Sequence, residues 1–179
     1  GLDPEGITFE AEYYAATEGG GTFITSEEWL LRPGSVGRPV DEGNLSVRDD
    51  EGRPLACDSV GTIWFRAPPV GRFEYFGDEK KTQSSYDGDW FTMRDMGYQD
   101  EAGYVFLTGR TSELIIPGGE NIYPKEIENV IAEHPAVSEV ACFGIPDEKW
   151  GESVCAAIVL KASIVQSIEQ IQAYCAERL

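Results

Sequence analysis

The sequence predicts a mixed α/β fold in which a strand-rich, small antiparallel barrel precedes an incomplete small α+β domain. Twenty glycines and ten prolines among 179 residues indicate many turns and few long helices. Short segments with alternating polar and apolar residues follow one another between residues 35 and 107, as is typical of antiparallel strands. After residue 110, helical and strand-like patterns alternate, which is typical of an α+β unit.

The first part of the chain contains several segments with the composition of short strands. These segments are residues 44–48, 61–66, 90–93 and 104–107. The polar loop 100–103 connects the last two, and a turn rich in glycine spans residues 13–21. Residues 25–31 suggest one short helical turn that ends at Arg32-Pro-Gly34. Together these elements predict an antiparallel sheet that closes into a small barrel.

The second part has longer and more regular elements. Ile127, Val130 and Ile131 recur at helical spacing between Pro124 and Glu133, and proline suits the first turn of a helix. Residues 138–145 and 153–160 are rich in Val, Ile, Ala and Cys, which predicts two strands. Ser163 and Gln166 have the spacing of a capping box before a last helix. The change of pattern predicts two domains, residues 1–110 and 111–179.

Composition and charge narrow the function classes. A net charge of −18 argues against nucleic acid and anionic membrane surfaces as partners, since both would repel the chain. No apolar run approaches the roughly 20 residues that cross a bilayer, so we expect no integral membrane association. The four cysteines are widely spaced and lack a histidine cluster, which favours buried thiols of a cytoplasmic protein.

Residues 14–21 form the first group with a possible chemical role. The ring of Tyr14 can stack on a base, the hydroxyl of Thr17 can bond a phosphate oxygen, and Glu18 can hold Mg²⁺. A turn with a solvated Glu explains the same residues. No Gly-Lys-Ser/Thr sequence occurs, so this is not a Walker phosphate loop.

Further candidates are Asp95 and Arg110. A carboxylate at a strand end can accept hydrogen bonds from two adjacent ribose hydroxyls, although a turn-capping Asp has the same appearance in a sequence. The fixed fork of a guanidinium suits a ribose or a phosphate, although an isolated Arg is usually a solvated surface charge. His134, the only histidine, lies at a helix-ending proline and offers no catalytic partner.

Residues 103–128 provide the most specific pattern: Gly-Arg, three residues, Leu-Ile-Ile, one residue, Gly-Gly-Glu-Asn-Ile, two residues, then Lys-Glu-Ile-Glu. This composite resembles the eighth core motif of adenylate-forming enzymes, which include acyl-CoA synthetases, peptide-synthetase adenylation domains and firefly luciferase. Residues 14–18 resemble the Tyr-Gly-x-Thr-Glu motif of that family, with Ala15 in place of the usual Gly. Residues 88–97 resemble its tryptophan and Thr-Gly-Asp pattern, with Met93-Arg94 in place of a small residue.

The resemblance implies roles for these positions. Tyr14 would pack against adenine, and Ala15 would line the nucleotide pocket with an additional methyl group. Thr17 would contact the phosphate, Glu18 would bind Mg²⁺, and Asp95 would bind the ribose of ATP or AMP. The segments 35–39 and 61–82, which include Arg38 and Trp64, are interpreted as scaffold.

In the family, the domain after Arg110 acts as a mobile C-terminal lid. The resemblance places Arg110 on the adenylate and the hinge at Ser112, where most relatives have Asp or Lys. The residues implied in coenzyme A binding are Gly118, Gly119, Glu120 and Trp150. In isolation, a glycine turn and a partly buried core Trp explain the same residues.

The resemblance implies a fragment of an ATP-dependent acyl-CoA ligase. Such an enzyme adenylates a hydrophobic carboxylic acid, fatty or steroid-like, and transfers the acyl group to coenzyme A; residues 12–22 and 29–39 resemble bacterial enzymes of this type. The alternatives are an adenylation enzyme that loads a carrier protein and a non-catalytic interaction module. The family's phosphate loop is expected before Gly1 and its catalytic Lys beyond Leu179, so we expect the fragment itself to be inactive.

Overall fold

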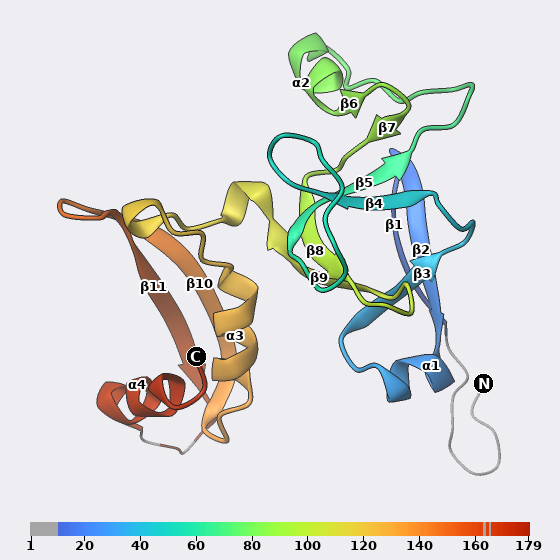
Figure 1. Cartoon of the computed structure of the whole chain (residues 1–179). Coiled ribbons are helices and arrows are strands. Elements are labelled where there is room, and N and C mark those ends of the chain that lie inside the picture. Colours follow the sequence, from blue (N-terminus) through green and yellow to red (C-terminus); the bar gives the residue numbers. More distant parts are fainter. Residues whose placement is uncertain (1–10, 163, 165) are drawn as a thin grey trace. The chain divides into compact units, whose positions relative to one another are not determined.

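The computed structural model describes residues 11–162, 164 and 166–179. The chain divides into two compact units, residues 1–107 and 108–179 (Figure 1). The division falls close to Arg110, where the residue pattern changes. The assignment of two functional domains to these parts stays a prediction.

Among the described residues, one sheet of nine strands makes up the first unit and continues in β9 to Arg110. The strands are β1 (Ala11–Ala16), β2 (Gly19–Thr25), β3 (Ser35–Pro39), β4 (Leu45–Arg48), β5 (Gly61–Arg66), β6 (Tyr86–Asp87), β7 (Trp90–Phe91), β8 (Asp95–Gln99) and β9 (Val105–Arg110). Their order is β1-β2-β3-β9-β8-β5-β7-β6, with β4 paired to β5. Two short helices flank the sheet, α1 (Ser26–Leu31) and α2 (Glu79–Ser84).

The strand-rich, mixed α/β class is confirmed, but the closed barrel is not. The sheet path ends at β1 on one side and at β6 on the other, and these strands do not pair within the described residues. Closure requires continuous hydrogen bonding between the first and last strands. Strands β6 and β7 have only two residues each, too few to bridge the opening. The sheet is therefore open.

The turn predicted over residues 13–21 is also largely wrong, because these residues form a hairpin. Strand β1 pairs with β2 antiparallel, and only Thr17 and Glu18 lie in the turn between them. The glycines lie in β2, where other groups pack directly on the backbone of Gly20 and Gly21 and leave no room for a side chain. A Cβ on Gly20 would lie 2.5 Å from the ring of Phe65, and one on Gly21 would lie 2.9 Å from the carbonyl oxygen of Tyr14.

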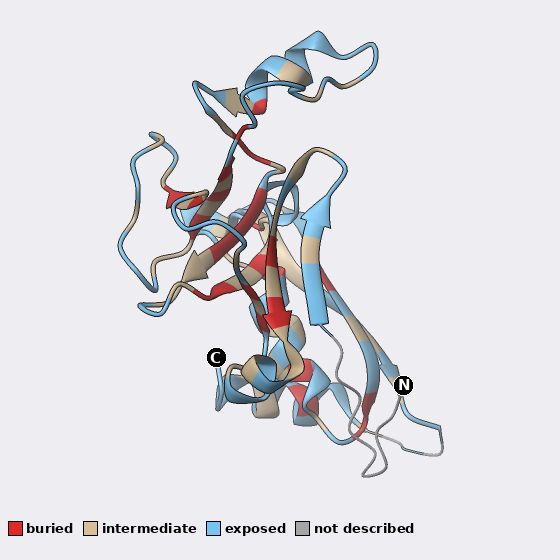
Figure 2. Cartoon of the chain, turned by 90° about the vertical axis from the view of Figure 1, so that its right-hand side faces the viewer, coloured by how far each residue is buried: buried red, intermediate tan, exposed pale blue. Residues whose placement is uncertain are grey.

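Aromatic and aliphatic side chains of the central strands form the core of the first unit. Its buried members are Leu45, Val47, Ile63, Phe65, Ala67, Phe91 and Val105. Along β5, buried residues alternate with partly or fully exposed ones, as expected for a sheet with one face inside (Figure 2). Helix α1 adds no buried residue but begins with a capping box, in which the Thr25 hydroxyl accepts the Glu28 amide and the Glu28 carboxylate accepts the Thr25 amide.

The second unit contains a hairpin with helices packed on it. Its elements are the 3₁₀ turns η1 (Thr111–Glu113) and η2 (Pro117–Gly119), helix α3 (Pro124–Ala132), strands β10 (Val137–Asp147) and β11 (Gly151–Leu160), and helix α4 (Ile168–Ala176). Helix α3 and both strands confirm the sequence predictions. Ser163 lies outside the described residues, and α4 begins instead with a capping box between Ser167 and Gln170.

The cysteines are free thiols within the described part of the chain. Only Cys142 is buried, and Cys57 is exposed, so the expectation of buried thiols holds for one of the four. Burial raises the pKa of Cys142 to about 11, with a smaller contribution from Glu128, so this thiol stays protonated at neutral pH. No helix in the described ranges has the length and apolar character to span a membrane.

We expect Phe91→Ala to lower the free energy of unfolding of the first unit by about 3–5 kcal/mol, because truncation of a fully buried ring leaves a cavity. Urea unfolding followed by tryptophan fluorescence measures the change. Phe76→Ala is the matched control, since Phe76 is fully exposed and its truncation should change stability by at most about 0.5 kcal/mol. Equal effects of the two substitutions would contradict this description of the core.

Candidate functional site

The hairpin β1–β2 directs neighbouring tyrosines to opposite faces of the sheet, because successive side chains of a strand alternate. The ring of Tyr13 lies 5.0 Å from the ring of Phe23, on the face that lines a surface cavity. The ring of Tyr14 lies 6.1 Å from the ring of Phe65 and packs against the core. Tyr14 is thus held on one side by buried aromatic groups.

Tyr14 and Asp95 meet although 81 residues separate them. The phenol of Tyr14 donates a hydrogen bond to Oδ2 of Asp95. Asp95 is the first residue of β8 and is only 9% exposed, so a donor to its carboxylate offsets part of the cost of burial. The structure therefore brings together two residues that the sequence assigned to one nucleotide.

Thr17 and Glu18 form the tip of the same hairpin. The hydroxyl of Thr17 donates to Oε2 of Glu18 and the phenol of Tyr75 donates to Oε1, each at 3.0 Å. Partial burial raises the pKa of Glu18, but these hydrogen bonds, its own backbone amide and the charge of Lys81 lower the pKa more, so it lies below its ordinary value. Glu18 is consequently ionised at neutral pH.

Mg²⁺ is usually bound by one or two carboxylates together with phosphate oxygens of a substrate. The single ionised carboxylate of Glu18, beside the hydroxyl of Thr17, fits a metal ion carried by a nucleotide. No group of three or more His, Cys, Asp or Glu residues that could hold a metal by itself occurs in the part of the chain that the structure describes. The donor set therefore suits Mg²⁺ bound to ATP.

Ala15 and Arg94 are the two departures from the family pattern in this unit. Ala15 is exposed, and its Cβ lies where a Cβ on Gly21 would approach within 3.1 Å. Arg94, directly before Asp95, has a φ of 65°, a conformation that glycine adopts without strain. Its amide donates to the hydroxyl of Thr92 at 2.9 Å and its guanidinium donates to Ser84 at 2.7 Å. These hydrogen bonds help to hold Arg94 in this conformation.

In the second unit, Arg110 ends strand β9 with an exposed side chain, and Ser112 lies in the exposed 3₁₀ turn η1. The turn η1 has no buried residue. Glu120 follows η2 and is also exposed. The roles of these residues remain predictions.

Gly118 and Trp150 are in direct contact. The amide of Gly118 donates to the carbonyl oxygen of Trp150 at 2.8 Å, and a Cβ on Gly118 would lie 2.8 Å from the indole ring. Gly118 has a φ of 63°, and Gly119, with a φ of 94°, has open space around it. The resemblance implied that both glycines bind coenzyme A; at Gly118 the group nearest to an added Cβ is the ring of Trp150.

One further contact fixes this loop on the hairpin, and a second closes the loop on itself. The amide of Ile116 donates to the carboxylate of Glu152 at 2.9 Å, and Ile115 forms a β-bridge with Ile122. The ammonium group of Lys149 lies 4.4 Å from the centre of the Trp150 ring, which is half exposed. Gly118 and Lys149 thus both contact an indole that keeps an open surface.

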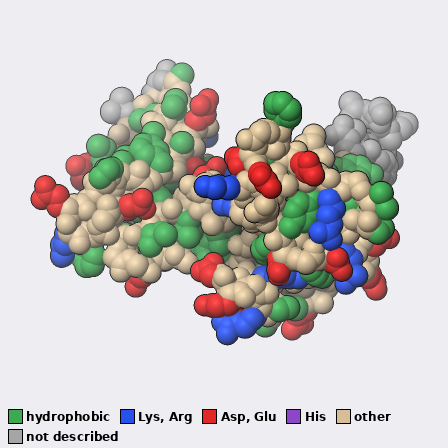
Figure 3. Space-filling view, turned by 90° about the horizontal axis from the view of Figure 1, so that it is seen from above, with side chains coloured by type: hydrophobic (Ala, Val, Ile, Leu, Met, Phe, Trp, Pro, Cys, Tyr) green, Lys and Arg blue, Asp and Glu red, His purple; other side chains and the backbone are tan. Residues whose placement is uncertain are grey.

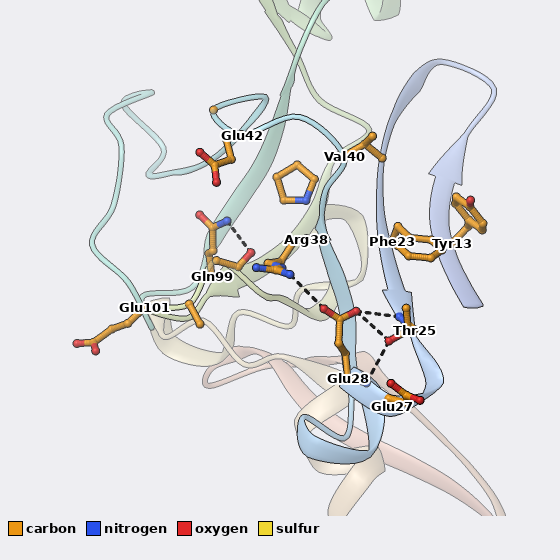
Figure 4. Close-up of a pocket in the computed structure, with 14 residues that line it drawn as sticks. Tyr13, Phe23, Thr25, Glu27, Glu28, Arg38, Val40, Glu42, Gln99 and Glu101 are labelled. Carbon is orange, nitrogen blue, oxygen red and sulfur yellow. Dashed lines mark hydrogen bonds and ion pairs between the residues drawn. The ribbon is translucent and has the colours of Figure 1, made fainter. Parts of the chain in front are cut away.

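A surface cavity of about 1020 Å³ lies in the first unit, and none of the predicted site residues lines it (Figure 4). Its lining residues are Tyr13, Phe23, Thr25, Glu27, Glu28, Arg38, Pro39, Val40, Glu42, Gly43, Gln99, Glu101, Ala102 and Gly103. The backbone amide of Thr25 and the hydroxyl of Tyr104 donate to Glu28, and with Arg38 they lower the pKa of Glu28 to about 2.

Sequence reasoning missed Tyr75 and the partners of Glu28. Tyr75 belongs to a segment interpreted as scaffold, and no short spacing links it to Glu18, 57 residues earlier. Glu28 was detectable, because Thr25 and Glu28 have the spacing of a capping box. The guanidinium groups of Arg32 and Arg38 lie 4.1 and 4.7 Å from the ring centre of Tyr104, an arrangement that no local pattern indicates.

Comparison with known proteins assigns the family. Residues 126–179 match the AMP-binding enzyme C-terminal domain. The chain is 42% identical over 168 residues to the long-chain-fatty-acid–CoA ligase FadD13 of Mycobacterium tuberculosis, which covers 93% of this chain and 33% of that enzyme. It is 40% identical over 154 residues to the fatty acid–[acyl-carrier-protein] ligase ScoC of Streptomyces coeruleorubidus, covering 83% and 30% of the two proteins.

Among solved structures, the chain is similar to o-succinylbenzoate CoA synthetase (MenE) from Bacillus subtilis. The complex of MenE with the acyl-adenylate intermediate gives a TM-score of 0.83 at 33% identity and covers 98% of this chain and 36% of MenE. Its complex with ATP and magnesium ion gives a TM-score of 0.80 at 33% identity, covering 94% and 35%. The chain belongs to the adenylate-forming enzymes and is a homologue of acyl-CoA ligases, of whose length it spans about a third.

We expect Gly118→Ala to displace the indole of Trp150, because the new methyl group would overlap the ring. Gly119→Ala is the matched control: its φ is also positive, but nothing lies within 4 Å of the added atom. Overpacking should make Gly118→Ala less stable than Gly119→Ala by about 1–3 kcal/mol. The indole ¹H–¹⁵N resonance of Trp150 should shift only in Gly118→Ala; equal shifts in both variants would contradict the contact.

The stability contribution of Glu28 should depend on pH. Its pKa in the folded state, about 2, lies below the ordinary 4.5, so the charged form stabilises the fold above pH 4.5 and the contribution disappears as pH falls towards 2. Wild type should therefore exceed Glu28→Gln in stability at pH 7, with a smaller difference at pH 3. Thermal unfolding across this range measures it, and a difference independent of pH would exclude the charge as its cause.

Proposed function

We propose that the protein carrying this chain is an ATP-dependent acyl-CoA ligase in the cytoplasm. It would adenylate a hydrophobic carboxylic acid, fatty or steroid-like, and transfer the acyl group to coenzyme A. The observation that carries the proposal is the hydrogen bond between Tyr14 and Asp95, since two motif residues from distant strands meet at one place. The identity with FadD13 supports a long, hydrophobic acid.

In the first half-reaction, the residues of the first unit would bind and orient the nucleotide. Tyr14 would present its ring to adenine beside Ala15, and Asp95 would accept hydrogen bonds from the ribose hydroxyls. Thr17 would contact the phosphate, and Glu18 would hold Mg²⁺. When bound, Mg²⁺ would neutralise charge on the phosphates. The acid carboxylate would attack the α-phosphate, the bond to the β-phosphate would break, and pyrophosphate would leave. Catalysis is then mainly positioning and charge neutralisation.

In the second half-reaction, the thiol of coenzyme A would displace AMP after the second unit rotates about Ser112. Arg110 would bind the adenylate beside this hinge. The residues proposed to contact the pantetheine arm are Gly118, Gly119, Glu120 and Trp150. The indole of Trp150 is half exposed and packs against Gly118. It would therefore offer an apolar surface to the uncharged pantetheine arm.

A second candidate is an enzyme that transfers the acyl group to the phosphopantetheine of a carrier protein. The identity with ScoC favours it, because ScoC is named for that acceptor. The third candidate is a non-catalytic interaction module, for which no ATP-dependent product is expected. The acceptor and the acid are therefore the variables that the experiment must separate.

The full-length protein, supplied with ATP, Mg²⁺ and a panel of fatty, steroid-like and short acids, should form acyl-CoA, AMP and pyrophosphate. Mass spectrometry identifies the products, and parallel reactions contain either coenzyme A or a phosphopantetheinylated carrier protein. Asp95→Ala should lower kcat/KM for ATP by about 100-fold, since loss of a hydrogen-bonded charged group costs about 1.5–3 kcal/mol. Acyl transfer to the carrier protein alone would overturn the CoA assignment, and absence of any adenylate would overturn the enzyme assignment.

A further inference from the structure

Tyr75 reaches the tip of the β1–β2 hairpin from a distant part of the chain. It lies between β5 and α2, and its phenol donates to Oε1 of Glu18 at 3.0 Å. The hydroxyl of Thr17 occupies the other oxygen, Oε2, at the same distance. Each carboxylate oxygen of Glu18 therefore accepts one O–H donor, and the plane of the carboxylate is fixed.

The phenol of Tyr75 is itself held in place. The backbone amide of Tyr75 donates to the hydroxyl of Thr82 at 2.8 Å, and that hydroxyl donates to the carbonyl oxygen of Asp78 at 3.0 Å. The ammonium group of Lys81 lies 3.8 Å from the centre of the ring, and the ring of Phe73 meets it edge-on at 5.4 Å. Contacts to the backbone and to the ring thus define the direction of the hydroxyl.

A carboxylate oxygen has two acceptor directions. Thr17 occupies one acceptor direction on Oε2 of Glu18, and Tyr75 occupies one on Oε1. The acceptor directions that remain on the two oxygens are therefore restricted to a defined part of space. A carboxylate at a hairpin tip would otherwise sample several rotamers. Groups that hydrogen-bond to a metal-binding carboxylate orient it and commonly affect metal affinity by 10–100-fold.

We propose that Tyr75 is a positioning residue that orients Glu18 for the Mg²⁺ of the bound nucleotide. The inference rests on the proposed function and adds to it a residue from the segment 61–82, which the sequence analysis interpreted as scaffold. Tyr75 touches neither the nucleotide nor the acid in this scheme; it acts through the carboxylate of Glu18.

Tyr75→Phe tests the proposal, and Tyr86→Phe is its matched control. Both substitutions remove one phenolic hydroxyl from the same region, but the hydroxyl of Tyr86 donates to the carbonyl oxygen of Phe73 at 3.1 Å rather than to Glu18. In the full-length protein with a non-hydrolysable ATP analogue, electron paramagnetic resonance of Mn²⁺ measures metal affinity directly. Tyr75→Phe should weaken Mn²⁺ binding about 10-fold, and Tyr86→Phe should leave it within about 2-fold of wild type.

Two further measurements separate positioning from a general structural effect. Tyr75→Phe should raise the KM for Mg²⁺ while the KM for the acid is unchanged. In a Glu18→Gln background, Tyr75→Phe should have no additional effect on Mn²⁺ affinity, because the two residues act as one unit. Independent, additive effects of these substitutions would overturn the proposal.

The outcomes also distinguish this inference from the proposed function. If wild type forms acyl-adenylate but Tyr75→Phe binds Mn²⁺ as tightly as Tyr86→Phe, the role of Tyr75 is overturned and the enzyme assignment stands. If the wild-type protein neither binds Mn²⁺ with the nucleotide analogue nor forms adenylate, both proposals fail together.

Discussion

The hydrogen bond from Tyr14 to the buried carboxylate of Asp95 is the constraint on which the first unit depends. Strands β1 and β8 are separated in the sheet by β2, β3 and β9, so their side chains can meet only if the sheet is strongly curved. The Phe65 ring, which lies directly on the backbone of Gly20, reinforces that curvature from inside. The sheet thus has the curvature of a barrel while its end strands stay apart within the described residues.

How much the sequence predicted depends on whether local or distant residues determine each feature. Helix α3 follows from helical spacing and strands β10 and β11 from runs rich in Val, Ile, Ala and Cys, and all three were predicted within a few residues. Barrel closure was wrong because it depends on pairing between distant strand ends. The candidate site shows the same division: motif spacing identified Tyr14 and Asp95, whereas the contact of Tyr75 with Glu18 arises only from the fold.

The excess of acidic residues affects which groups of the first unit suit a nucleotide. With 32 acidic and 14 basic residues, the chain repels polyanions at long range, and acidic side chains are spread over the face shown in Figure 3. Several arginines lie over aromatic rings, as Arg48 does at 4.6 Å from the ring centre of Trp90. Such arginines stabilise the fold by cation–π contact, and the charge of Arg48 is also paired with the carboxylate of Asp87 at 3.0 Å. Ordered hydroxyls and a metal ion are therefore the more suitable groups for a nucleotide here.

The packing of Trp150 on Gly118 limits which substitutions these two positions tolerate during evolution. A side chain at position 118 and a large ring at position 150 compete for one volume, so neither position is free to drift alone. A homologue without the indole would have more room for a methyl group at position 118, and one that keeps the indole should retain the glycine. The two positions should accordingly covary across an alignment, as a pair of coupled substitutions rather than as two separately conserved sites.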